Sequence, residues 1–194
     1  MVLIGTAAQS QGFTGGLMVG GSVGQITGDE AFGYRKIGLT AGVRAGYDFQ
    51  SKLSLEMELL FNQKGSKPSK REKPLQGDWV ISLNYFEIPV LVGYKDWLSE
   101  AEDFYHLVFY TGASYGYLFS TTFTNQKYGF VQNELKKHDF SFILGTHYYI
   151  NSHLGLTGRY ERSINKLWKK TIPDDRFSNF MLPYQFNLCL FYMF

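Results

Sequence analysis

Charged side chains recur at alternate positions inside apolar stretches of this chain, and ion pairing is the chemistry that they could perform. They are Arg44, Glu56, Glu58, Glu87, Arg159 and Glu161. Because a β-strand turns successive side chains to opposite faces, each charge falls on the polar face of a segment whose other face is apolar. If those polar faces meet in one enclosed space, arginine must pair with glutamate there, since an unpaired buried charge is costly. We expect a structural role for this lumen charge cluster; a proton or ion path is the alternative.

Signals for catalysis and for metal binding are poor. The four histidines fall on different segments without metal-ligand spacing, and neither a Gly-x-Ser-x-Gly nor an HExxH motif occurs. His138 beside Asp139 is the one local acid–base candidate, and chance adjacency explains it better. The single Cys189 excludes a disulfide within this chain. We therefore expect no enzyme activity, no catalytic or metal-binding residues and no cofactor.

Eight segments of alternating character are expected to form the strands that position these charges. In the last segment one face is uniformly large and apolar: Tyr184, Phe186, Leu188, Leu190, Tyr192 and Phe194. Its other face is polar or small. The fifth segment is apolar on both faces, which leaves its register open. The segments cover residues 13–23, 37–49, 53–62, 83–94, 105–119, 140–150, 154–161 and 184–194.

Two kinds of barrel fit this alternation. A membrane barrel turns its apolar face outward, whereas a soluble lipocalin-like barrel turns it inward to bind a small apolar ligand. Aromatic residues make up 18% of the chain, and bulky rings stand at the strand ends, where membrane interfaces would lie. No run approaches the roughly 18 apolar residues of a transmembrane helix. The charges of the polar face are few and of both signs, so the apolar-out arrangement is the better interpretation.

The connections between the segments alternate in length. Those at 50–52 and 151–153 are minimal and the one at 95–103 is of medium length, whereas four others are long: 25–36, 65–82, 120–137 and 165–180. This sorting is typical of outer-membrane barrels. It predicts that the short turns and both termini are periplasmic and that the long loops are extracellular.

One predicted extracellular loop is basic, through Lys64, Lys67, Lys70, Arg71 and Lys73. It could bind anionic lipopolysaccharide or an acidic partner, and a solvated loop without a ligand is the alternative. The net charge is only +2, with the basic residues in connections rather than on a helix face, so no nucleic acid is expected as a partner.

The amino terminus allows two interpretations. Residues 1–10 resemble the end of a secretory signal peptide with a small-residue cleavage site, although no charged region precedes the short apolar run. The alternative is a frayed terminus of the mature chain. Residues 11–194 are expected to form a single barrel domain.

Two segments also resemble those of a known family. They are residues 55–65, LEMELLFNQKG, and residues 83–94, LNYFEIPVLVGY. They are similar to the third and fourth strands of the PorT-like outer-membrane β-barrel domain family of Bacteroidota, where such strands flank a variable loop. The chain departs from the family at Met57, where proline is frequent, and in its fifth segment. The resemblance implies an eight-stranded outer-membrane barrel, and some relatives are associated with protein secretion.

The sequence as a whole predicts an all-β fold: an eight-stranded antiparallel up-and-down transmembrane β-barrel in the outer membrane. The expected function is that of a structural or accessory subunit of a protein-secretion or envelope-assembly complex. Outer-membrane lipid and lipopolysaccharide are the expected partners, together with other envelope or secretion-complex proteins. The alternative is the soluble lipocalin-like barrel with a small apolar ligand.

Overall fold

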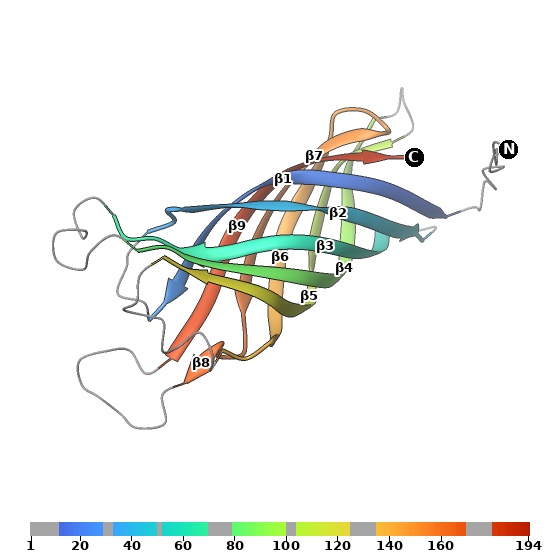
Figure 1. Cartoon of the computed structure of the whole chain (residues 1–194). Coiled ribbons are helices and arrows are strands. Elements are labelled where there is room, and N and C mark those ends of the chain that lie inside the picture. Colours follow the sequence, from blue (N-terminus) through green and yellow to red (C-terminus); the bar gives the residue numbers. More distant parts are fainter. Residues whose placement is uncertain are drawn as a thin grey trace, which may run out of the picture.

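Antiparallel β-strands make up nearly all of the chain that the computed structural model describes, namely residues 12–28, 33–49, 52–69, 79–99, 104–124, 135–169 and 180–194. Within these ranges no helix has the length and apolarity that a membrane crossing requires. The strands, shown in Figure 1, are β1 (Phe13–Thr27), β2 (Lys36–Asp48), β3 (Leu53–Ser66), β4 (Ile81–Ser99), β5 (Phe104–Phe123), β6 (His138–Tyr149), β7 (Leu154–Ser163), β8 (Trp168–Lys169) and β9 (Phe180–Met193).

The strands close into a barrel. Each long strand pairs antiparallel with its neighbours in chain order, and β1 completes the ring by pairing with β9, from Gly16 opposite Met193 to Thr27 opposite Leu182. β8 is a two-residue strand that pairs with the start of β9 and is not one of the eight strands of the barrel wall. The eight-stranded antiparallel barrel predicted from the sequence is confirmed. We call its two ends the short-turn end, where β2 meets β3 and β6 meets β7, and the long-loop end.

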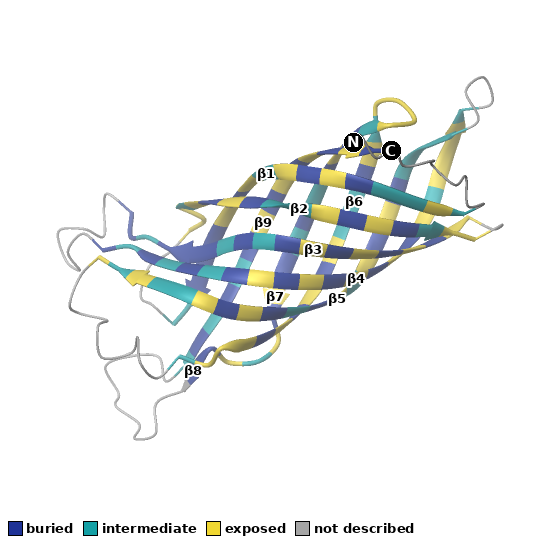
Figure 2. Cartoon of the chain, turned by 45° about the vertical axis from the view of Figure 1, so that its right-hand side comes forward, coloured by how far each residue is buried: buried dark blue, intermediate teal, exposed yellow. Residues whose placement is uncertain are grey.

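Burial alternates along every long strand, as the banding in Figure 2 shows. On β3, Glu56 and Glu58 are 5% and 1% exposed, whereas the neighbouring Met57 is 56% exposed. Apolar side chains therefore face outward and polar side chains face the lumen. A continuous apolar exterior suits lipid rather than water. The lipocalin-like alternative required the opposite arrangement and is not favoured.

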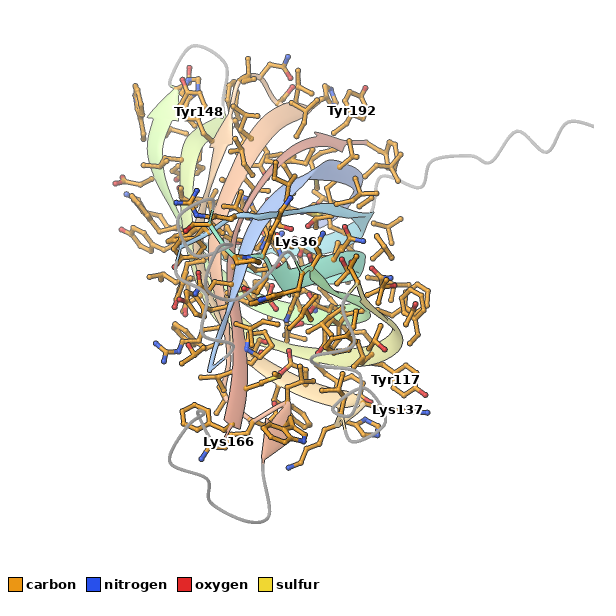
Figure 3. All side chains as sticks on the ribbon, turned by 60° about the vertical axis from the view of Figure 1, so that its left-hand side comes forward. Lys36, Tyr117, Lys137, Tyr148, Lys166 and Tyr192 are labelled. Carbon is orange, nitrogen blue, oxygen red and sulfur yellow. The ribbon has the colours of Figure 1, made fainter. Side chains whose placement is uncertain are left out.

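The outward face carries aromatic rings toward both ends of the barrel. Tyr148 and Tyr192 lie at one end of the barrel in Figure 3, and Tyr117 lies near the other end. Lys137 and Lys166 lie at the same end as Tyr117. The three tyrosines are 40%, 49% and 38% exposed. Such rings at the two interfaces flank the apolar band of a transmembrane barrel. On β9 the predicted outward residues face away from the lumen, with Leu188 the most exposed, at 65%, and Phe194, directly after the strand, is 72% exposed.

Several strands run further than their segments predicted. β4 and β5 have 19 and 20 residues, about twice the 9 to 11 that cross a bilayer. The predicted connection at 95–103 is too long, because β4 continues to Ser99 and β5 begins at Phe104. At the long-loop end, β3 continues to Ser66, into residues that were expected to be a loop.

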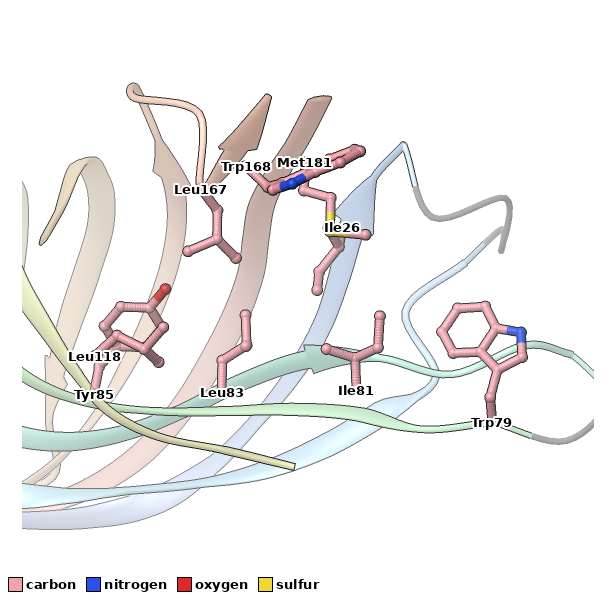
Figure 4. Close-up of a cluster of buried hydrophobic side chains, with 9 residues drawn as sticks. All are labelled: Ile26, Trp79, Ile81, Leu83, Tyr85, Leu118, Leu167, Trp168 and Met181. Atoms are coloured by element: carbon pink, nitrogen blue, oxygen red, sulfur yellow. The ribbon is translucent and has the colours of Figure 1, made fainter. Parts of the chain in front are cut away.

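A cluster of apolar side chains fills the inside of the barrel at the long-loop end (Figure 4). We call it the apolar cap; it consists of Ile26, Trp79, Ile81, Leu83, Tyr85, Leu118, Leu167, Trp168 and Met181. Its presence explains why the fifth segment is apolar on both faces. The inward face of β5 supplies Leu118 to the apolar cap and Tyr110 to a second buried cluster with Leu91 and Ile143.

Glycine is required where neighbouring strands approach closely on the inner face. A Cβ atom at Gly42 would lie 2.1 Å from the carbonyl oxygen of Leu59, and one at Gly20 would lie 2.2 Å from that of Leu188. Both distances are far below van der Waals contact. These two glycines therefore keep the barrel narrow, and its interior must be filled by the side chains of the remaining inward positions.

Candidate functional site

Lys64 is the centre of the largest group of charges in the lumen. Its Nζ lies 2.6 Å from Glu161 Oε1, 2.7 Å from Glu87 Oε1 and 2.9 Å from Asp139 Oδ2. The ring of Tyr85, from the apolar cap, lies 5.0 Å from the same nitrogen. All four charged side chains are buried. We call Lys64, Glu87, Asp139 and Glu161 the Lys64 cluster.

Neutral side chains hold the three carboxylates of the Lys64 cluster in place. The Asn62 amide donates to Glu87 over 2.7 Å and to Glu161 over 3.4 Å. Gln185 donates to Glu161 over 3.1 Å. The hydroxyls of Ser163 and Ser141 donate to Asp139 over 2.8 and 3.2 Å. Each acid thus has hydrogen-bond partners besides the shared lysine, which a buried carboxylate requires.

The position of Lys64 corrects the prediction that it belongs to a basic loop. β3 continues through it, and the residue is 2% exposed because it lies on the same face as Glu56 and Glu58. The period of two that placed those glutamates extends through Asn62 to Lys64, and this signal could have found it. Lys67 follows β3 and is half-buried. The other predicted members of the basic loop lie outside the described residues: Lys70, Arg71 and Lys73.

Arg159 and Glu58 form a second ion pair further toward the short-turn end. Arg159 Nη1 donates to Glu58 Oε2 over 2.7 Å, and Nη2 donates to Oε1 over 3.1 Å. Two parallel hydrogen bonds of this kind give the pair a fixed geometry. Both side chains are buried, and Arg159 also faces the sulfur of Met18 at 3.7 Å.

A third group joins Arg44, Glu56 and His147. Arg44 Nη2 donates to Glu56 Oε2, and His147 Nε2 lies 3.1 Å from each of these two atoms. The rings of Tyr110 and Phe191 enclose the group: Tyr110 stacks on His147 at 4.2 Å, and Phe191 lies 4.9 Å from the guanidinium carbon of Arg44. His147 was not among the predicted site residues, although it lies on the polar face of its segment.

The structure therefore places all six residues of the predicted cluster in the lumen, but in three separate groups. The register of β2 and β3 sets Arg44 opposite Glu58, yet Arg44 bonds Glu56 and leaves Glu58 to Arg159 on β7. Among the described residues, the buried cations Arg44, Lys64 and Arg159 share the interior with five carboxylates. That excess of acid concentrates in the Lys64 cluster.

His138 and Asp139 do not form an acid–base pair. Asp139 points into the lumen toward Lys64, whereas His138 is exposed and its Nδ1 lies 2.7 Å from the hydroxyl of Tyr115. Adjacent residues of a strand face opposite sides of the sheet, so the side chains of His138 and Asp139 cannot act together although they are neighbours in sequence. Within the described ranges, no group of three or more His, Cys, Asp or Glu side chains is placed to hold a metal ion.

A cavity of about 290 Å³ lies at the short-turn end of the lumen. Arg44 and Glu56 belong to its wall, and Lys95 and Asp48 form an ion pair of 3.1 Å beside it. The wall also includes the aromatic residues Phe104, Tyr105 and Tyr149. We call this space the mouth cavity. It combines charged and apolar surfaces, as ligand sites do.

Comparison with known proteins agrees with this architecture. A family model described as an outer membrane protein beta-barrel domain matches residues 7–169. No match was found among curated proteins. The attachment invasion locus protein Ail of Yersinia pestis is similar in structure over 95% of this chain and 100% of that one, with a TM-score of 0.51 and 11% identity. Neisserial surface protein A is similar over 93% and 96%, with a TM-score of 0.50 and 11% identity. These two likenesses concern the fold, and the PorT-like assignment stays a prediction.

Proposed function

The chain belongs to the outer membrane protein β-barrel domain family, and from this premise we propose that it is a structural or accessory subunit of a protein-secretion or envelope-assembly complex. The PorT-like resemblance of residues 55–65 and 83–94 is part of the same proposal. Outer-membrane lipid and lipopolysaccharide surround the barrel, and proteins of the envelope contact its ends.

The filled lumen is the observation that carries this proposal. The apolar cap and three groups of ion pairs occupy the interior from the long-loop end to the mouth cavity. A barrel of eight strands has an interior just wide enough for side chains, so free diffusion of solutes through it is not the function that this geometry supports. The surfaces left for activity are the outer face and the two ends.

We propose the orientation that is usual for such barrels, with the short-turn end in the periplasm and the long-loop end outside the cell. Lys137 and Lys166 then stand near the lipopolysaccharide headgroups, and we extend this role to the loop residues Lys67, Lys70, Arg71 and Lys73. Basic side chains there would meet anionic headgroups. The mouth cavity would open toward the periplasm.

Site-specific photo-crosslinking in intact cells tests the accessory role. We would place a photoreactive residue at Trp97, at the short-turn end, and at Ile164, at the long-loop end, which are 61% and 68% exposed. Leu188, 65% exposed in the middle of the outward face of β9, is the matched control. We expect a discrete protein adduct at one end of the barrel and only lipid adducts at Leu188. Lipid adducts alone at all three positions would contradict the proposal.

A further inference from the structure

The ammonium group of Lys64 faces more acceptors than it has hydrogens. An ammonium carries three N–H donors. They go to Glu161 Oε1 over 2.6 Å, to Asp139 Oδ2 over 2.9 Å and to the hydroxyl of Ser141 over 3.3 Å. Glu87 Oε1 lies 2.7 Å from the same nitrogen, yet among the described residues no group donates a hydrogen bond to it. One oxygen of Glu87 is therefore left without a donor.

The other two acids of the Lys64 cluster have more donors than Glu87. Asp139 Oδ2 accepts from two serine hydroxyls as well as from the lysine. Glu161 accepts from the lysine at Oε1, and at Oε2 from Gln185 over 3.1 Å and from Asn62 over 3.4 Å. Glu87 accepts one hydrogen bond, from Asn62 over 2.7 Å. Because hydrogen bonds to a carboxylate stabilise its ionised form, Glu87 is the least supported of the three as an anion.

The surroundings of Glu87 hold more negative than positive charge. With its three acids ionised, the Lys64 cluster combines one positive and three negative charges, and each of its four residues is at most 3% exposed. A buried acid in such a place avoids the cost of its charge by binding a proton. The groups gathered around Glu87 are Lys64 on β3, Asp139 on β6, Glu161 on β7 and the phenol of Tyr85 on its own strand, while β5 presents Gly116 and β9 the neutral Gln185.

We propose that Glu87 is a proton-binding site, protonated near neutral pH, and that release of its proton turns a hydrogen of Lys64 from β6 toward β4. A neutral Glu87 leaves the cluster with one fewer negative charge. When the carboxyl O–H bond breaks and the proton passes to water, Oε1 becomes part of an anion and requires a donor. Lys64 is within reach at 2.7 Å, and its ammonium then gives up its longest hydrogen bond, that to Ser141 on β6. The proton site concerns the lumen and does not depend on the accessory role.

The neutral acid has an acceptor for its own hydrogen. Glu87 Oε2 lies 2.7 Å from the Asn62 amide, a distance typical of an O–H···O hydrogen bond. A half turn of that amide presents its oxygen to Glu87 and its NH2 group to Thr40. The Thr40 hydroxyl faces the side-chain oxygens of Asn62 and Asn187 at 2.9 and 3.0 Å with a single hydrogen, so the turned amide suits this neighbour too. Glu161 loses its 3.4 Å contact with the amide but keeps its bonds to the lysine and the glutamine.

Carbon NMR of the refolded full chain, in a neutral maltoside detergent near neutral pH, tests the proton site. The readout is the isotope-labelled side-chain carboxyl carbon of glutamate, whose chemical shift separates a neutral acid from a carboxylate. Exposed glutamates are ionised at this pH. We expect one neutral-acid signal, which is lost in Glu87→Gln and kept in the matched control Glu58→Gln, where a buried glutamate paired with arginine is removed. The absence of a neutral-acid signal in the full chain, or its persistence in Glu87→Gln, would overturn the proposal. If Glu58→Gln fails to fold, the other two spectra still decide the question.

Raising the pH of the same sample tests the response of Lys64 to release of the proton. We expect the Glu87 signal to move to the carboxylate position and the backbone amide signal of Ser141 to shift over the same pH range. In Glu87→Gln the Ser141 signal should not shift, because no acid is present at position 87 to compete for the lysine. An equal shift of Ser141 in both proteins would contradict the coupling between β4 and β6. So would a Ser141 signal that stays fixed while Glu87 ionises, or a Glu87 signal that never reaches the carboxylate position.

Discussion

Lys64 is one buried cation among three carboxylates, and this imbalance sets what its neighbours can tolerate. A buried ion pair adds little net stability to a protein, but removal of one partner is costly because it leaves an uncompensated buried charge. In the Lys64 cluster, removal of the lysine and removal of one acid have opposite effects on the stability of the folded state. Loss of the lysine leaves three acids facing one another, whereas loss of one acid relieves repulsion.

We therefore expect Lys64→Met to lower the free energy of unfolding by about 3 to 5 kcal/mol. Glu87→Gln should leave it unchanged or raise it, because the amide oxygen can still accept the hydrogen bond from Asn62. Urea unfolding in lipid vesicles near neutral pH measures both variants. Lys137→Met, at an exposed lysine, is the control and should change the free energy by no more than about 0.5 kcal/mol. A large loss in Glu87→Gln would show that all three acids are needed as charges.

Single residues also show where prediction from the sequence stops. The period of two places Arg44, Glu56 and Glu58 on the inner face, because that period is a property of each strand alone. Which arginine meets which glutamate depends instead on the stagger of strands around the barrel. Glu58 finds its partner on β7, 101 positions away in the sequence. No spacing within one segment contains that information.

At the scale of elements, β9 gives the sharpest test of which face meets lipid. Its outward residues alternate with Gln185, Asn187 and Cys189, which are buried. The alternation of this strand could be read from the sequence from Tyr184 onward, although β9 begins earlier, at Phe180. β8 could not, because it pairs with β9 and its Trp168 packs in the apolar cap against residues from distant parts of the chain.

Leu188→Arg should lower the free energy of unfolding in lipid by about 2 to 4 kcal/mol, since a charge on the outward face near the bilayer midplane has no polar partner. Ile164→Arg is the matched control: Ile164 is similarly exposed but lies just beyond the end of β7, where the expected cost is about 0 to 1 kcal/mol. Equilibrium unfolding from vesicles measures both. Equal costs at the two positions would place Leu188 outside the hydrocarbon region.

At the scale of the whole molecule, closure between β1 and β9 predicts resistance to detergent. A closed barrel has no free strand edge, so the folded protein should migrate faster than the boiled protein on an SDS gel. A chain truncated before residue 184 lacks most of β9 and should lose this difference. Identical mobility of boiled and unboiled full-length protein, refolded in detergent, would argue against closure.

The pairing of β1 with β9 also has a consequence in time. Gly20 and Cys189 are partners in the register, so the ring cannot close until β9 has been synthesised. Contacts between residues so far apart in sequence are slow to form, and until they form both edge strands offer unpaired backbone groups to other chains. The nascent protein should therefore aggregate unless a binding partner protects those edges during transit. The protein is therefore most prone to aggregation in the interval before β9 pairs with β1.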